Sequence, residues 1–159
     1  MTKKEEDYIA KLEKHADNLR SANFYSIQRI DLLIISISSA GIYASLEIMK
    51  YVMASELLKP DQVAGFNIYF KITSLLFIVA IITNFVSQWT AHKGTSYSIE
   101  STKKEIYALE YKVDSSKEIS YCDKYAEKYN KITTYTNTCS TLSMFLGLVI
   151  MIISVWAIF

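Results

Sequence analysis

The sequence predicts an all-α membrane protein made of three long helices, with three transmembrane spans and a projecting cytoplasmic helical bundle. Its 159 residues include only four Gly and one Pro, too few for the turns of a many-stranded sheet protein. Hydrophobic residues make up 51% of the chain and charged residues 21%. The apolar residues gather in three nearly uncharged windows, each close to the ~20 residues that a membrane-crossing helix needs. The mean hydropathy of +0.16 averages these windows with strongly charged segments.

Residues 1–29 are predicted to form a cytoplasmic amphipathic helix. Apolar side chains recur there at 3-4-3 spacing, with Lys and Glu between them: Ile9, Leu12, Ala16 and Leu19. The first span follows at residues 30–54, interrupted only by Asp31, Glu47 and Lys50. No helix breaker separates the two segments, which predicts one continuous helix.

An outer loop is expected at residues 55–65, followed by a second span at residues 66–90 with Lys71 as its single charge. Residues 91–137 should form a cytoplasmic helical hairpin. Its first helix carries Ile99, Ile106 and Val113 at seven-residue spacing, and its second carries Tyr121, Tyr125 and Tyr129 at steps of four. These stripes favour bundle packing, with a ligand-binding tyrosine surface as the alternative.

The hairpin should turn at Asp114-Ser115-Ser116, where Ser115 and Glu118 have the spacing of a capping box. The third span, residues 138–159, carries no charge.

The distribution of Lys and Arg predicts the orientation. Six precede the first span, eight lie between the second and third, and three lie in or near the loop between the first two. We therefore expect a multi-pass membrane protein with a cytoplasmic N-terminus and the C-terminus at the outer face. The net charge of +1 predicts no nucleic-acid partner.

Polar residues within a span usually face protein or water, because exposure to lipid is costly. In the first span Asp31, Ser38 and Ser45 form one seven-residue stripe, and a second stripe contains the following residues: Ser36, Tyr43 and Glu47. Several protomers around an axis, four or more, would enclose an aqueous path lined by these six residues. The alternative is that the serines pack helices and that Glu47 pairs with Lys50 or Lys71.

The third span carries Ser140, Gly147 and Ser154 at seven-residue steps. Small residues on one face let helices approach closely, so this stripe predicts a helix-packing surface. The spacing leaves open whether it packs within one protomer or between protomers.

Enzymatic chemistry is not indicated. Cys122 and Cys139 form no CxxC pair, and the two histidines, His15 and His92, lie far apart in the sequence. There is no phosphate-binding Gly loop, nucleophile elbow or HExxH motif. We therefore expect no catalytic residues, no metal and no cofactor.

The order of features resembles a known family. A segment containing Ala22, Phe24, Tyr25 and Arg29 enters a Ser/Gly-rich span, and the second span leads into Ala91-His92-Lys93-Gly94, Tyr97 and the run KKEIYAL from Lys103 to Leu109. Over about residues 20–113 this resembles the SLATT membrane proteins of bacterial conflict systems, which have two spans and a long cytoplasmic helix. The third span departs from that pattern.

The resemblance implies a pore-forming effector of anti-phage defence that lies in the bacterial inner membrane and depolarises or permeabilises this membrane in an infected cell, similar in kind to the membrane effector of the Hailong system. It also implies gating through the cytoplasmic bundle by a nucleotidyltransferase partner or its nucleotide product. Basic residues near the membrane would then be candidates for binding the signal: Arg29, Lys93, Lys103 and Lys104. Two alternatives stay open, a non-conducting subunit that anchors a soluble enzyme and a phage holin-like lysis protein.

Overall fold

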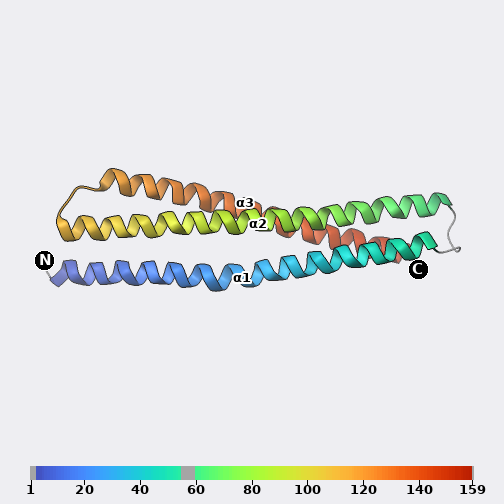
Figure 1. Ribbon diagram of the computed structural model, residues 1–159, viewed down its shortest axis with the longest axis horizontal. Helices are drawn as coiled ribbons and strands as arrows, with labels where there is room; N and C mark the ends of the chain where they lie inside the picture. Colours follow the sequence, from blue (N-terminus) through green and yellow to red (C-terminus); the bar gives the residue numbers. More distant parts are fainter. Residues whose placement is uncertain (1–2, 55–59, 159) are drawn as a thin grey trace. The chain divides into compact units, whose positions relative to one another are not determined.

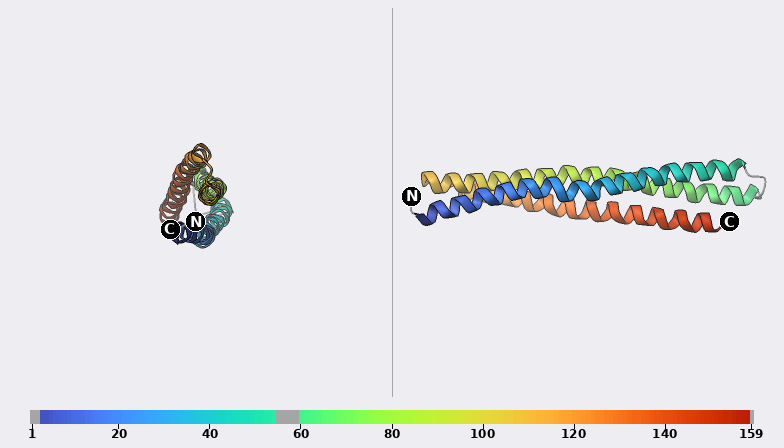
Figure 2. Two further views of the ribbon diagram at one scale, coloured as in Figure 1. Left: turned by 90° about the vertical axis from the view of Figure 1, so that its left-hand side faces the viewer. Right: turned by 90° about the horizontal axis from the view of Figure 1, so that it is seen from below.

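The computed structural model describes residues 3–54 and 60–158. For residues 3–5, 20, 22–30 and 60–62 it describes the backbone but not the side chains. The described chain is helical apart from residues 112–115 and 157–158, which confirms the all-α part of the predicted class. It contains α1 (Lys3–Ala54), α2 (Pro60–Tyr111) and α3 (Ser116–Trp156), coloured in chain order in Figure 1 and seen from two more sides in Figure 2. Each helix contains a segment that is long and apolar enough to cross a membrane.

The chain divides into two compact units. Unit 1 comprises Met1–Ile30 and Val86–Tyr135, and unit 2 comprises Asp31–Phe85 and Thr136–Phe159. Each helix therefore contributes one segment to each unit. Most charged residues belong to unit 1, whereas unit 2 contains most of the three apolar windows.

In unit 2, the buried positions of α1 and α2 follow a 3-4-3-4 spacing. On α1 they are Asp31, Ile34, Ser38, Gly41 and Ser45, and on α2 they are Phe70, Thr73, Phe77, Ala80 and Asn84. This period of 3.5 residues is typical of coiled-coil packing, in which each buried side chain enters a space between residues of the neighbouring helices. Ile34, Phe77, Ala80 and Met144 form its apolar core.

Phe77 is the central side chain of this core. It is 0% exposed. A Cβ atom added to Gly41 of α1 would lie 2.4 Å from the ring, and one added to Gly147 of α3 would lie 3.1 Å from it. The two glycines therefore provide the space in which the ring of Phe77 fits between the helices.

In unit 1, α2 presents small residues to α3. Ala91 and Gly94 are buried, and a Cβ atom on Gly94 would meet Oδ1 of Asn130 at 2.5 Å. Gly94 does not interrupt α2 but lets the two helices approach. Tyr97 stacks on Tyr125 and Tyr129, with ring centroids 5.4 and 5.8 Å apart. These tyrosines join the two helices, as the packing interpretation predicted.

The predicted stripe on α1 is confirmed at Ile9 and Ala16, which are buried. The stripe predicted on α2 was partly wrong. Ile99 and Ile106 are only partly buried, and Val113 is 50% exposed beyond the end of the helix. Small polar residues occupy the buried face instead, since Ser101 and Thr102 are 6% and 8% exposed. A pattern based on apolar residues does not detect such a face.

One predicted boundary needs correction. α2 begins at Pro60, so residues 60–65 of the expected 55–65 loop are helical, while 55–59 lie outside the described residues. Pro is favoured in the first helical turn, where its missing N–H needs no partner. α3 begins directly after Ser115, as the turn predicted, because the backbone carbonyl of Ser115 accepts hydrogen bonds from the N–H groups of Glu118 and Ile119 at 3.1 and 3.0 Å. The carboxylate of Asp114 adds a hydrogen bond from the N–H of Ser116 at 3.0 Å.

Candidate functional site

The first candidate pore stripe lies inside unit 2. Asp31, Ser38 and Ser45 are 4%, 0% and 0% exposed. The hydroxyl of Ser45 donates to the carbonyl oxygen of Gly41 at 2.7 Å and lies 3.8 Å from the sulfur of Met151 on α3. In this structure these residues pack between helices of one chain, so lining a pore would require the unit to open. Their pore-lining role stays a prediction.

The second candidate stripe lies on the outside of unit 2. Ser36 and Glu47 are exposed, and Tyr43 is 68% exposed. The carboxylate of Glu47 pairs with the ammonium of Lys50 at 2.8 Å, and these side chains are 46% and 70% exposed. The structure thus separates the six candidates into a buried stripe and an exposed one.

The small residues of α3 pack within the chain. The hydroxyl of Ser140 donates to the carbonyl oxygen of Ala80 on α2 at 2.7 Å. Gly147 faces Phe77, and the hydroxyl of Ser154 donates to the carbonyl oxygen of Ile150 at 2.7 Å. The question that the spacing left open is therefore answered for this structure: the stripe packs against α2 of the same chain.

The basic candidates for signal binding differ in their surroundings. Lys93 and Lys103 are exposed. Lys104 forms ion pairs with Glu118 at 2.8 Å and with Glu100 at 3.6 Å. The hydrogen bond from its ammonium to Glu118 raises the pKa of Lys104. Two carboxylates thus already compensate the charge of Lys104, which leaves Lys93 and Lys103 more available to an anion. The side chain of Arg29 lies outside the described residues.

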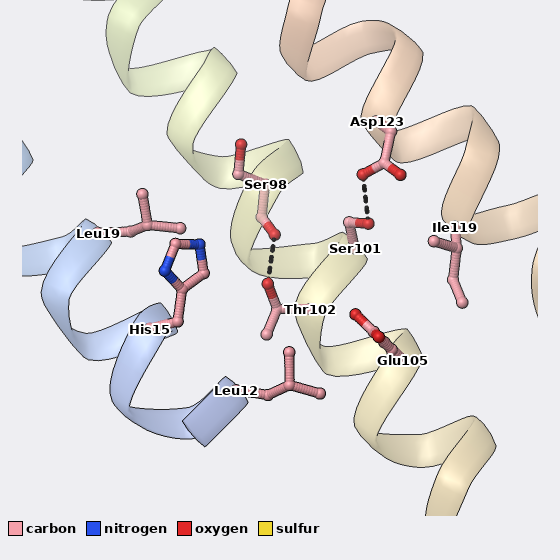
Figure 3. Close-up of a pocket in the computed structure, with 9 residues that line it drawn as sticks. All are labelled: Leu12, His15, Leu19, Ser98, Ser101, Thr102, Glu105, Ile119 and Asp123. Atoms are coloured by element: carbon pink, nitrogen blue, oxygen red, sulfur yellow. Dashed lines mark hydrogen bonds between the residues drawn. The ribbon is translucent and has the colours of Figure 1, made fainter. Parts of the chain in front are cut away.

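Unit 1 contains a groove that the sequence patterns did not reveal. Its volume is about 380 Å³, and all three helices line it (Figure 3). His15 and two leucines come from α1, Glu105 and hydroxyl residues from α2, and Asp123 from α3. The sequence signal was weak because these residues lie on three segments with no common motif.

Hydrogen bonds already use the hydroxyl donors of this groove. Ser101 donates to the carboxylate of Asp123 at 2.6 Å, and Thr102 donates to the backbone carbonyl of Ser98 at 3.0 Å (Figure 3). Glu105 accepts a hydrogen bond from the Tyr8 hydroxyl at 2.9 Å, which raises the pKa of Tyr8. The lining contains two carboxylates and no Lys or Arg. The groove is therefore electrostatically unsuited to an anionic nucleotide.

No group of three or more His, Cys, Asp or Glu side chains able to hold a metal ion occurs among the described residues. Of the two cysteines, Cys122 is 1% exposed and Cys139 is exposed. Burial raises the pKa of the Cys122 thiol, which keeps it protonated at neutral pH. Comparison of the chain with protein-family models, with curated proteins and with solved structures finds no match.

Proposed function

We propose that the protein is a homo-oligomeric, pore-forming membrane effector that depolarises or permeabilises the bacterial inner membrane in anti-phage defence. The observation that carries the proposal is the exposed stripe of α1, with Ser36, Tyr43 and Glu47 on the outer surface of unit 2. These residues belong to one of three helices that are apolar enough to cross a membrane.

In a bilayer, the exposed stripe of α1 would face either hydrocarbon or water. An ionisable side chain facing hydrocarbon costs about 2.5–3.5 kcal/mol near the bilayer centre by insertion scales. The Glu47–Lys50 pair lowers this cost, but both side chains remain exposed on the protomer. Protomers arranged with the stripe toward a central axis would place it in water. Three helices enclose too little space alone, so the pore would need about four or more subunits.

Orientation follows from the Lys and Arg distribution, with the N-terminus and the polar hairpin in the cytoplasm and the C-terminus at the outer face. The proposed gating signal is a nucleotide or a nucleotidyltransferase partner that binds unit 1, as the SLATT resemblance implies. A ligand opens such a pore only if it binds the open state more tightly than the closed state. Lys93 and Lys103 are the favoured contacts because both are exposed and Lys104 is ion-paired.

The experiment is cysteine modification of the protein reconstituted in lipid bilayers. The background carries Cys122→Ser and Cys139→Ser, and single cysteines replace Tyr43, Glu47 or the buried Ser45. A charged, membrane-impermeant thiol reagent should reduce the current through the Tyr43→Cys and Glu47→Cys proteins. It should leave the Ser45→Cys protein unchanged, because Ser45 is 0% exposed. Equal insensitivity of all three conducting variants would refute a pore lined by the exposed stripe.

Expression in cells separates this function from the two alternatives. A channel should collapse the membrane potential and arrest growth without releasing cytoplasmic proteins. Gross lysis would identify a holin-like protein instead. A protein that conducts in no reconstituted condition, with or without a cognate nucleotidyltransferase and its nucleotide product, would fit a non-conducting anchor.

A further inference from the structure

The groove of unit 1 combines apolar and acidic walls from all three helices (Figure 3). Leu12, Leu19 and Ile119 provide the apolar surface. Glu105 of α2 and Asp123 of α3 provide carboxylates. The volume of about 380 Å³ is at the lower end of the range of about 300–1,000 Å³ that small-molecule sites occupy. The groove therefore has room for a small ligand with both charged and apolar parts.

Both carboxylates of the groove lack a cationic partner in the part of the chain that the structure describes. Asp123 accepts a hydrogen bond from the Ser101 hydroxyl at 2.6 Å, and Glu105 accepts one from the Tyr8 hydroxyl at 2.9 Å. A hydroxyl donates a hydrogen bond but brings no positive charge. The described ion pairs of unit 1 use other carboxylates, those of Glu100, Glu118 and Glu127. The groove therefore carries two uncompensated negative charges, which favour a cationic ligand.

The spacing of the two carboxylates indicates how long that ligand is. Asp123 bonds to Ser101, and Glu105 lies four residues after Ser101 on the same helix. Four residues of an α-helix span about 6 Å, so the two charges are offset by about one helical turn along α2. Although His15 lines the groove with these two acids, no group of three such side chains among the described residues could hold a metal ion. A ligand that pairs with both carboxylates must therefore be longer than a single ion.

We propose that the groove binds a short linear alkyl diamine, with one ammonium group paired to Asp123 and the other to Glu105. The ammonium groups of a diamine with a four-carbon chain are about as far apart as one helical turn is long. Its methylene groups pack on the leucines of α1, which removes apolar surface from water. A ligand in this position contacts all three helices and stabilises their packing. The site uses residues of unit 1 alone, so it does not depend on the proposed pore.

The test is calorimetric titration of the full-length protein in detergent, at constant ionic strength, with putrescine, the diamine that has a four-carbon chain. Butylamine has the same carbon chain but a single ammonium group. It should bind about two- to fivefold more weakly, the usual effect of losing one exposed ion pair. Asp123→Asn and Glu105→Gln should each weaken putrescine binding by a similar factor. Glu127→Gln removes the same charge from α3 outside the groove and should leave the affinity unchanged.

A fourth variant occupies the site from within the protein. His15→Lys places an ammonium group at the wall of the groove and should weaken putrescine binding, because the new charge competes for the carboxylates. The helix signal should stay unchanged, since His15 is exposed and Lys is a good helix former.

Three results would overturn the proposal. The first is the absence of putrescine binding to the wild-type protein, and the second is equal affinity of the wild-type, Asp123→Asn and Glu105→Gln proteins. The third is binding of butylamine or of magnesium chloride as tight as that of putrescine, because a single charge or a single ion would then suffice. Conductance is not measured, so none of these results bears on the pore.

Discussion

Substituting Gly41 by Ala tests the packing of unit 2 most directly. The added Cβ would lie 2.4 Å from two ring carbons of Phe77. Carbon atoms pack at about 3.5–4.0 Å, so the ring or the helix must move by about 1 Å. The ring is fully buried, and Gly147 lies against it from α3. The clash therefore cannot be relieved by a small rotation.

The magnitude follows from two opposing terms. Overpacking of a close-packed core costs about 1–3 kcal/mol. Replacing a helical Gly by Ala contributes about 1 kcal/mol in the opposite direction. The substitution Gly65→Ala measures the gain in helix propensity alone, because nothing lies within 4 Å of a Cβ atom added at Gly65. The Gly41→Ala protein should thus melt about 2–12 °C below the Gly65→Ala protein.

The assay is thermal or denaturant unfolding of each variant in the same detergent. Gly147→Ala should lose less than Gly41→Ala, because its Cβ would meet the ring at 3.1 Å, where a shift of a few tenths of an ångström suffices. Combining Gly41→Ala with Phe77→Leu should recover part of the loss, giving a coupling of about 0.5–3 kcal/mol. If Gly41→Ala is as stable as Gly65→Ala, the contact between Phe77 and Gly41 does not limit packing and the reasoning fails.

Three further predictions concern unit 1 and the cysteines. Lys112, directly after α2, has a φ of 53°, a left-handed conformation that glycine adopts more easily than lysine. Unfolding measurements should therefore show that Lys112→Gly stabilises the protein by about 1 kcal/mol, whereas Tyr111→Gly, within the helix, destabilises it. The hydrogen bonds from Ser116 lower the pKa of Asp114 below its ordinary 3.8, so its contribution is present above that value and is lost as the pH falls through the lowered pKa. The protection of the amides in the first turn of α3, measured as their exchange rates relative to the intrinsic rates at each pH, should therefore fall on acidification, and Asp114→Ala should abolish this pH dependence. Cys139 should react with a small thiol reagent in the folded protein and Cys122 only after unfolding, and equal labelling rates by mass spectrometry would contradict the burial of Cys122.

The helices themselves were predictable because their signals are local. The low Gly and Pro content favours helices throughout the chain. The apolar windows and the turn at Asp114-Ser115-Ser116 can each be recognised in one short stretch of sequence. The end of the loop was misplaced because the prediction began the helix with the apolar window at residue 66, whereas α2 already begins at Pro60. The start of α3 was predictable because Asp114 and Ser115 are adjacent and both are good cap formers.

The candidate site was only partly predictable. Seven-residue spacing placed Asp31, Ser38 and Ser45 on one face of α1, but spacing does not say what that face contacts. A buried polar stripe and a pore-lining stripe have the same pattern in sequence. The tertiary contacts of Ser45 with Met151 and of Asn84 with Asp31 are what place the stripe inside the chain.

Three long helices, each partly apolar and partly charged, could be predicted from the sequence because helix formation and hydrophobic length depend on neighbouring residues. The folded chain was needed to find the buried face of each helix, the fit of Phe77 between Gly41 and Gly147, and the hydrogen bond from the Asn84 amide to the Asp31 carbonyl. Such contacts join residues far apart in the chain, and their fit depends on distances of a few tenths of an ångström.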